Sequence, residues 1–258
     1  MRKSLIAAVA VIVAALAVPA IGQADDIQSI TANLTPAKRS KKSYKPAQIY
    51  VEILTKKSGT GTLPEQPPSA TNTKVNFPKN AKFDPTAVPR CKATEAQLQN
   101  TTTAQATEKC GSKSIVSKGS TVPTDPPGAN HTTGTSAWVY VQVVPGPGGG
   151  GFGVPVQVTA FNGNKPGTLF LHSRADLVNN TSVLVGKIKD GPKGYGKQLD
   201  VKVPPLQAGA IARFTVTVKN GKYVQARCKK KNMKFQAITK FSNFPTATDD
   251  FSSKCKQK

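Results

Sequence analysis

Three kinds of side chain in this sequence could do chemistry: four cysteines, two histidines and a large excess of lysine. A cysteine can form a disulfide, ligate a metal or act as a thiolate nucleophile. A histidine can act as a general base, and clustered lysines attract polyanions through their charge. The spacing of these residues decides between the roles.

The cysteines fall into two pairs that are close in sequence, Cys91 with Cys110 and Cys228 with Cys255. An even number of cysteines in an exported chain predicts disulfides, of which three pairings are possible. The sequence-local pairing closes two loops, each worth roughly 3–4 kcal/mol in the chain-entropy model. Zinc sites usually have two to four residues between paired cysteines and a nearby histidine, and the spacings here are longer. We therefore predict two sequence-local disulfides and no metal.

No arrangement of residues in the sequence identifies a catalytic centre. His172 ends the apolar strand pattern of residues 169–172, which is typical of a hydrogen-bonded structural histidine, and His131 lies in a Thr/Asn-rich loop. Residues 148–153 match the dinucleotide-binding Gly-x-Gly-x-x-Gly spacing, but a strand pattern follows them where the mechanism needs a helix. We predict no catalytic residue and no cofactor.

Charge is the outstanding feature of the composition: 36 Lys and Arg against 13 Asp and Glu, a formal net charge of +23. The candidate polyanion-binding residues are Lys38, Arg39, Lys41, Lys42, Arg227, Lys229, Lys230, Lys231 and Lys234. Lysine acts as a point charge rather than as a bidentate reader. The sequence therefore predicts attraction to anionic wall polymers, acidic polysaccharide or other polyanions, with a merely basic solvated surface as the alternative.

The elements that must position these residues fall into three parts. A basic start, an apolar run from Leu5 to Val18 and a small-x-small site ending at Ala24 predict a signal peptide at residues 1–24. The apolar run is shorter than the roughly 20 residues of a spanning helix. Residues 25–46 are rich in Lys, Ser and Thr and are predicted to be a disordered basic arm. Residues 47–258 are predicted to be a single domain, secreted or associated with the cell envelope.

That domain is expected to be all-β. About ten short strand patterns follow one another with turn signals every 8–12 residues, which is typical of an antiparallel β-sandwich. Residues 136–144 and 154–161 are expected to pair as a hairpin, and Asn220-Gly221 predicts a second one. The stretch between Cys91 and Cys110 has the only helical signals after the predicted signal peptide, which predicts a small disulfide-clamped helical insert at 91–110.

The order of several short motifs resembles a family of uncharacterised secreted proteins of soil actinobacteria. The motifs are Pro89-Arg90-Cys91, Leu98, Lys109-Cys110, Lys118-Gly119-Ser120, Phe161-Asn162-Gly163 and Ala226-Arg227-Cys228 with Cys255. The resemblance covers roughly Ala47 to Cys255. It departs where Lys92-Ala93 and Gly111 replace the family's Ser-Pro and Pro. It implies a secreted, β-rich fold and carries no function.

Two function classes remain open from the sequence. The first is an exported non-catalytic protein that associates with anionic envelope or matrix polymers. The alternative is a carbohydrate- or lipid-directed enzyme or binding module with a site of scattered residues. A concave face carrying Trp138 and Tyr140 would favour the alternative, whereas lysines gathered on one face would favour the first.

Overall fold

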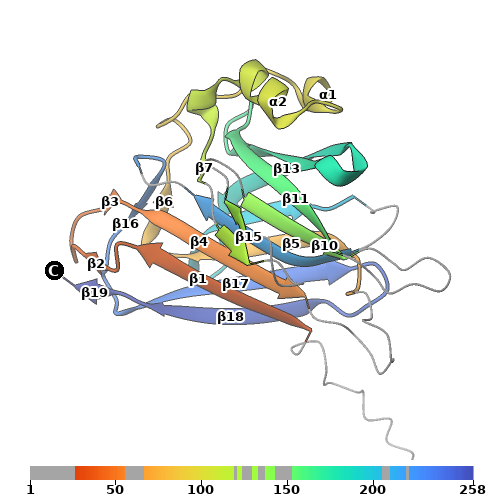
Figure 1. The fold of residues 1–258 in the computed structure, drawn as a ribbon. Helices are drawn as coiled ribbons and strands as arrows, with labels where there is room; N and C mark the ends of the chain where they lie inside the picture. The colour runs from red at the N-terminus through yellow and green to blue at the C-terminus, as the bar shows by residue number, and fades with distance from the viewer. Residues whose placement is uncertain are drawn as a thin grey trace, which may run out of the picture.

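The computed structural model describes residues 27–55, 67–118, 121–123, 130–132, 137–142, 153–204, 210–218 and 221–257. The predicted signal peptide, residues 1–24, lies outside these ranges. Strands dominate the described residues, and the longer strands pair antiparallel (Figure 1). The prediction of an all-β fold is therefore confirmed.

The elements follow one another along the chain in this order. They are β1 (Gln28–Thr35), β2 (Lys38–Arg39), β3 (Lys45–Pro46), β4 (Gln48–Thr55), β5 (Ala70–Pro78), β6 (Ala81–Phe83), α1 (Glu95–Leu98), α2 (Thr103–Cys110), a 3-10 turn η1 (Ser112–Ser114), β7 (Ser117–Lys118), β8 (Thr121–Pro123), β9 (Asn130–Thr132), β10 (Ala137–Gln142), β11 (Gly153–Asn162), β12 (Thr168–Ala175), η2 (Asp176–Val178), β13 (Asn180–Asp190), β14 (Tyr195–Lys202), β15 (Ala210–Val218), β16 (Val224–Ala226), β17 (Asn232–Phe241), β18 (Ala247–Lys254) and β19 (Lys256–Gln257).

The main sheet curls so that its two ends touch. Its strands pair in the order β1-β4-β15-β10-β11-β12-β13-β14-β5-β17-β18, with β7 paired to β15 beside this path. At the seam β1 lies against β18. There the backbone N–H of Ile30 donates to a carboxylate oxygen of Asp249 at 2.6 Å. A β-sandwich consists of two sheets packed face to face, whereas these strands pair along one continuous path. The expectation of a sandwich therefore stays a prediction.

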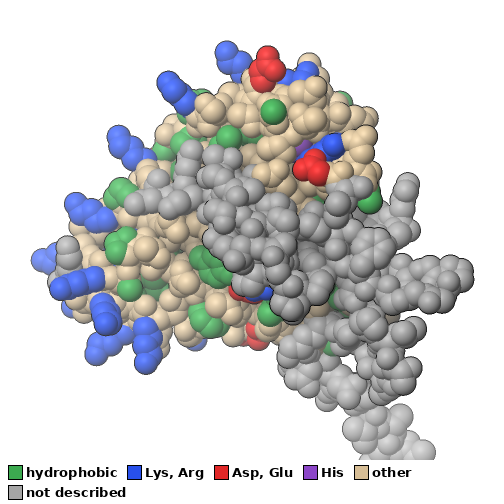
Figure 2. All heavy atoms as spheres, in the orientation of Figure 1, with side chains coloured by type: hydrophobic (Ala, Val, Ile, Leu, Met, Phe, Trp, Pro, Cys, Tyr) green, Lys and Arg blue, Asp and Glu red, His purple; other side chains and the backbone are tan. Residues whose placement is uncertain are grey.

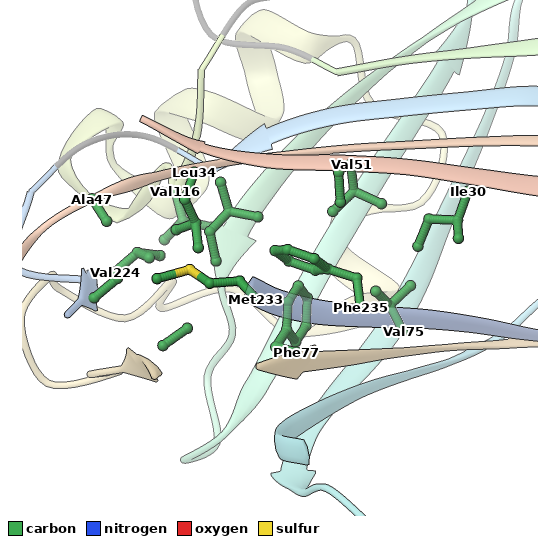
Figure 3. Close-up of a cluster of buried hydrophobic side chains, with 14 of the residues drawn as sticks. Ile30, Leu34, Ala47, Val51, Val75, Phe77, Val116, Val224, Met233 and Phe235 are labelled. Carbon is green, nitrogen blue, oxygen red and sulfur yellow. The ribbon is translucent and has the colours of Figure 1, made fainter. Parts of the chain in front are cut away.

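Apolar side chains from opposite parts of the curled sheet meet in its interior. Buried and more exposed residues alternate along β1, β4 and β17, as expected for strands with one face inward. Leu34 and Val51 on β1 and β4 face Phe77 and Phe235 on β5 and β17 (Figure 3). The rings of Phe77 and Phe235 pack edge to face, with centroids 6.4 Å apart. This core is the main stabilising element of the fold.

The prediction that residues 25–46 form a disordered arm is wrong over most of its length. Residues 28–35 form β1, which pairs antiparallel with β4 along its whole length. Ile30, Ala32 and Leu34 are buried, so this strand contributes one wall of the core. The prediction failed because the lysines that follow the strand lowered the average hydrophobicity of the segment, while the alternation of Ile30, Ala32 and Leu34 carried the signal.

Both short helices of the predicted insert begin with a capping box. The side chain of Thr94 accepts a hydrogen bond from the backbone N–H of Gln97, whose side chain in turn accepts one from the Thr94 N–H, and Thr102 and Gln105 repeat the arrangement. The disulfide-clamped helical insert is therefore confirmed. In the described part of the chain, no helix has the length and apolar character needed to cross a membrane.

The insert covers the outer face of β11, β12 and β13. Leu98 and Ala106 pack there with the Cys91–Cys110 disulfide against Phe161 and Phe170. The alternate residues of these strands face the interior of the sheet. Where the insert packs, β12 is therefore covered on both faces, which explains the uninterrupted apolar run Leu169-Phe170-Leu171.

One of the two predicted hairpins forms. Strands β10 and β11 pair antiparallel, as the sequence predicts, with Ala137 opposite Val158. Strands β15 and β16 do not pair with each other, although Asn220-Gly221 separates them. Instead β16 pairs with β3 and β6 in a separate small sheet. The pairing of β16 with β3 places the basic residues after β16 beside the lysines of the β2–β3 segment.

Candidate functional site

Three basic segments that are far apart in sequence meet at one end of the molecule. They are the β2–β3 segment, the segment after β16 and the C-terminal tail. The backbone N–H of Cys228 donates to Ser40 O at 2.8 Å, and that of Lys256 donates to Ala37 O at 3.0 Å. Strand β19 pairs in parallel with β2, which places Lys256 opposite Lys38.

Two disulfides have the predicted sequence-local pairing, Cys91 with Cys110 and Cys228 with Cys255. Only the second lies at this end of the molecule. It covalently joins the segment after β16 to the tail, and the N–H of Cys255 donates to Lys231 O at 2.7 Å beside it. The disulfide thus holds two of the basic segments together.

Most of the predicted polyanion-binding residues are exposed on this surface, which we call the basic end. The basic end comprises exposed Lys38, Lys41, Lys42, Lys45, Lys79, Lys82, Lys229, Lys230, Lys231, Lys234, Lys254 and Lys256, with half-buried Arg227. Lys and Arg side chains project from the end of the molecule that carries β2, β3 and β19 (Figures 1 and 2). Strand pairing and the disulfide have therefore gathered residues that the sequence places in separate runs.

Among the described residues, no carboxylate forms an ion pair with the basic end. The ion pairs found among the described residues lie elsewhere, as in Lys189 with Asp200 and Lys197 with Asp190, each at 2.7 Å. Each pair joins β13 to β14. The lysines of that hairpin are thus partly compensated, whereas no side chain of the basic end forms an ion pair within the described residues.

Arg39 is a correction to the predicted set. Its side chain is buried, with only 3% of the residue exposed, and Nη1 donates to the carbonyl oxygen of Pro46 at 3.3 Å. Burial lowers the pKa of Arg39. The alternation of β2 turns Arg39 inward and leaves Lys38 outward, so Arg39 contributes to packing and is not available to an external polymer.

Tyr44 is a residue of this surface that the sequence analysis missed. Two cations lie over its ring, Lys82 Nζ at 4.2 Å and Arg227 Cζ at 4.6 Å from the ring centroid. These contacts bring the β2–β3 segment, β6 and the segment after β16 together around one aromatic ring. The sequence feature that could have identified Tyr44 is its position inside the Lys-rich run of residues 41–45.

His172 is structural rather than part of this surface. It is fully buried on β12 beneath the insert, where Nε2 lies 3.1 Å from the carbonyl oxygen of Thr101. Because a carbonyl oxygen can only accept a hydrogen bond, Nε2 carries the proton and donates. Burial lowers the pKa of His172, and Nδ1 has no hydrogen-bond partner among the described residues. A neutral histidine therefore links the insert to the sheet.

Metal binding finds no geometric support in the described residues. No group of three or more metal-ligating side chains occurs in them. The side chains of Trp138 and Tyr140, on which the carbohydrate-directed alternative depends, lie outside the described side chains. Comparisons with protein-family models, with curated proteins and with solved structures found no match to this chain. The basic end is therefore the surface from which a function can be argued.

Proposed function

We propose that the protein is exported and associates with anionic polymers of the cell envelope or extracellular matrix through its basic end, without catalysing a reaction. The observation that carries this proposal is the convergence, at one end of the fold, of three basic segments whose side chains form no ion pair with a described carboxylate. The whole chain has a formal charge of +23, and removal of Arg2 and Lys3 with the predicted signal peptide leaves +21, which extends the attraction beyond direct contact.

The composition of the basic end supports binding by charge rather than by recognition of one polymer. All but one of its cations are lysines, which act as point charges without fixed hydrogen-bond geometry. Lysines that neutralise a polyanion release its condensed counterions, so affinity falls steeply as salt rises. Polyphosphate, an acidic polysaccharide and DNA are therefore all expected to bind in dilute salt.

A salt titration of binding to two chemically different polyanions tests the proposal. Polyphosphate and polygalacturonate differ in their charged groups, and binding to each is measured by calorimetry from about 50 mM to 500 mM salt. We expect both affinities to fall with salt, because the Debye length shortens from about 10 Å at 0.1 M to 3 Å at 1 M. Absence of binding to either polymer at 50 mM salt, or an affinity indifferent to salt, would overturn the proposal.

Two triple variants with equal loss of charge test where the polymer binds. Replacing Lys229, Lys230 and Lys231 with Gln removes three exposed lysines of the basic end. This change should weaken binding and lower the slope of log affinity against log salt by about 2–3 for a DNA probe.

The matched control replaces Lys92, Lys109 and Lys113 with Gln. These lysines are exposed in or beside the helical insert, away from the basic end (Figure 1). The control should change the salt slope much less. Equal effects of the two triple variants would show that total charge, and not the basic end, drives binding.

A further inference from the structure

The interior of the curled sheet is not completely filled. A cavity of about 120 Å³ lies inside it, lined by side chains from β4, β5, β11, β12, β13, β14 and β15. The lining includes Val51, Val75, Val158, Leu171, Leu199 and Val216. A single water needs only about 10–15 Å³ of such space, so the cavity is large enough for a small organic molecule.

The lining is almost entirely aliphatic and aromatic, apart from a few Ser and Thr side chains. Two of those, Thr73 and Thr239, are 3.3 Å apart through their hydroxyl oxygens. Protein interiors have few voids larger than one water, and buried water needs two to four polar partners. An apolar cavity of this size is better suited to an apolar ligand than to water.

Tyr223 is also one of the lining residues. Only 2% of the residue is exposed, and its ring packs edge to face on Phe83, with centroids 6.4 Å apart. Its hydroxyl has no hydrogen-bond partner among the described residues. Burial raises the pKa of Tyr223, so the hydroxyl keeps its proton and remains a donor. Buried hydroxyls nearly always have a partner in folded proteins.

Among the described residues, no charged side chain lines the cavity. A carboxylate or an ammonium group would therefore enter it without a counter-ion, which is strongly unfavourable in an apolar interior. This excludes charged amphiphiles from the full depth of the cavity and favours neutral molecules.

We propose that the cavity binds a small neutral apolar molecule that carries one hydrogen-bond-accepting oxygen, with the hydrocarbon part among the aliphatic side chains and the oxygen accepting a hydrogen bond from Tyr223. Ketones, ethers and esters of low polarity have this chemistry. The site lies inside the sheet, so it is independent of polymer binding at the basic end.

Acetophenone and isopropylbenzene provide matched probes, because they have the same number of non-hydrogen atoms and differ chiefly in the carbonyl oxygen. Binding of each to the full protein is measured by calorimetry and by the rise in the thermal unfolding midpoint. We expect both to bind, and Tyr223→Phe to weaken acetophenone binding about five- to tenfold while leaving isopropylbenzene unaffected or bound more tightly.

A second variant tests the location. Ala160 lines the cavity from β11, and Ala160→Phe should fill the space and abolish binding of both probes. Ala160→Leu, a smaller change, replaces it where the Phe variant does not fold. Failure of both probes to bind the unmodified protein, equal effects of Tyr223→Phe on both, or undiminished binding to the filled variant would each overturn the proposal.

Discussion

The backbone N–H of Ile30 in β1 donates a 2.6 Å hydrogen bond to the carboxylate of Asp249 in β18. This contact bridges the seam of the curled sheet, where β1 and β18 touch without a ladder of backbone hydrogen bonds between them. A charged acceptor is suited to this position, because hydrogen bonds to an ionised group are stronger than neutral ones. Asp249 therefore substitutes for part of the missing ladder.

Asp249→Ala should lower the free energy of unfolding by about 1–3 kcal/mol, because it leaves the Ile30 N–H without its acceptor in a partly buried seam. Asp249→Asn keeps an acceptor oxygen at the same place and should lose less. Urea denaturation of both variants measures the difference. Equal stability of the Ala variant and the unmodified protein would show that the seam does not depend on this bond.

Strand β1 is expected to be essential for stability, in contrast to the disordered arm predicted from composition. Leu34 is 6% exposed and belongs to the main core, so Leu34→Ala should cost about 2–5 kcal/mol. Its neighbour Asn33 points outward, and Asn33→Ala is the matched control, expected to change stability by less than about 0.5 kcal/mol. Similar effects of the two changes would indicate that β1 does not pack on the core in solution.

The stability contributed by neutral His172 should depend on pH. Burial lowers the pKa of His172 below the ordinary value of 6.5, so near that pH the unfolded chain binds more protons than the folded one. Stability is therefore complete above about pH 6.5 and declines as pH falls from there toward the folded-state pKa, with a limiting slope of about 1.4 kcal/mol per pH unit.

His172→Gln isolates this contribution. The Gln amide can donate to Thr101 O as Nε2 does, but it has no titration in this range. The difference in unfolding free energy between the unmodified protein and the variant should shrink or reverse between pH 7 and pH 5. A difference that stays constant with pH would mean that His172 is not held neutral by burial.

The sequence predicted those parts of the fold in which local chemistry and tertiary structure agree. Strands β4, β11 and β12 carry strong apolar patterns, and the helical signals between Cys91 and Cys110 correspond to both short helices. Strand β18 was missed because it is an edge strand in which Ala247 is buried but residues 248–254 are only partly buried or exposed. Its pairing with β17 comes from backbone hydrogen bonds, which composition does not show.

The candidate site, too, could be predicted from the sequence only in part. The excess of lysine and the pairing of Cys228 with Cys255 were predicted from the sequence, and this disulfide joins the segment after β16 to the C-terminal tail. The inward orientation of Arg39 and the position of Tyr44 could not, because both depend on how β2 and β3 pair with distant strands. The interior cavity depends on the curvature of the whole sheet and has no local sequence signal.

The final prediction concerns the two disulfides, which should differ in their effect on polymer binding. Replacing Cys228 and Cys255 with Ala removes the bond that closes a loop of sequence separation 27, and should cost about 3–4 kcal/mol of stability in the chain-entropy model. It should also weaken polyphosphate binding by roughly twofold or more, because the tail and the segment after β16 would no longer be held as one charged surface.

Replacing Cys91 and Cys110 with Ala is the matched control, since it removes a disulfide of similar loop length, sequence separation 19, and leaves every lysine in place. Both variants are first shown to be folded by circular dichroism, and polyphosphate binding is then measured at 50 mM salt. Only the Cys228–Cys255 variant should bind more weakly. If neither variant or both variants lose affinity, the arrangement of lysines at the basic end does not determine binding, and total charge alone accounts for it.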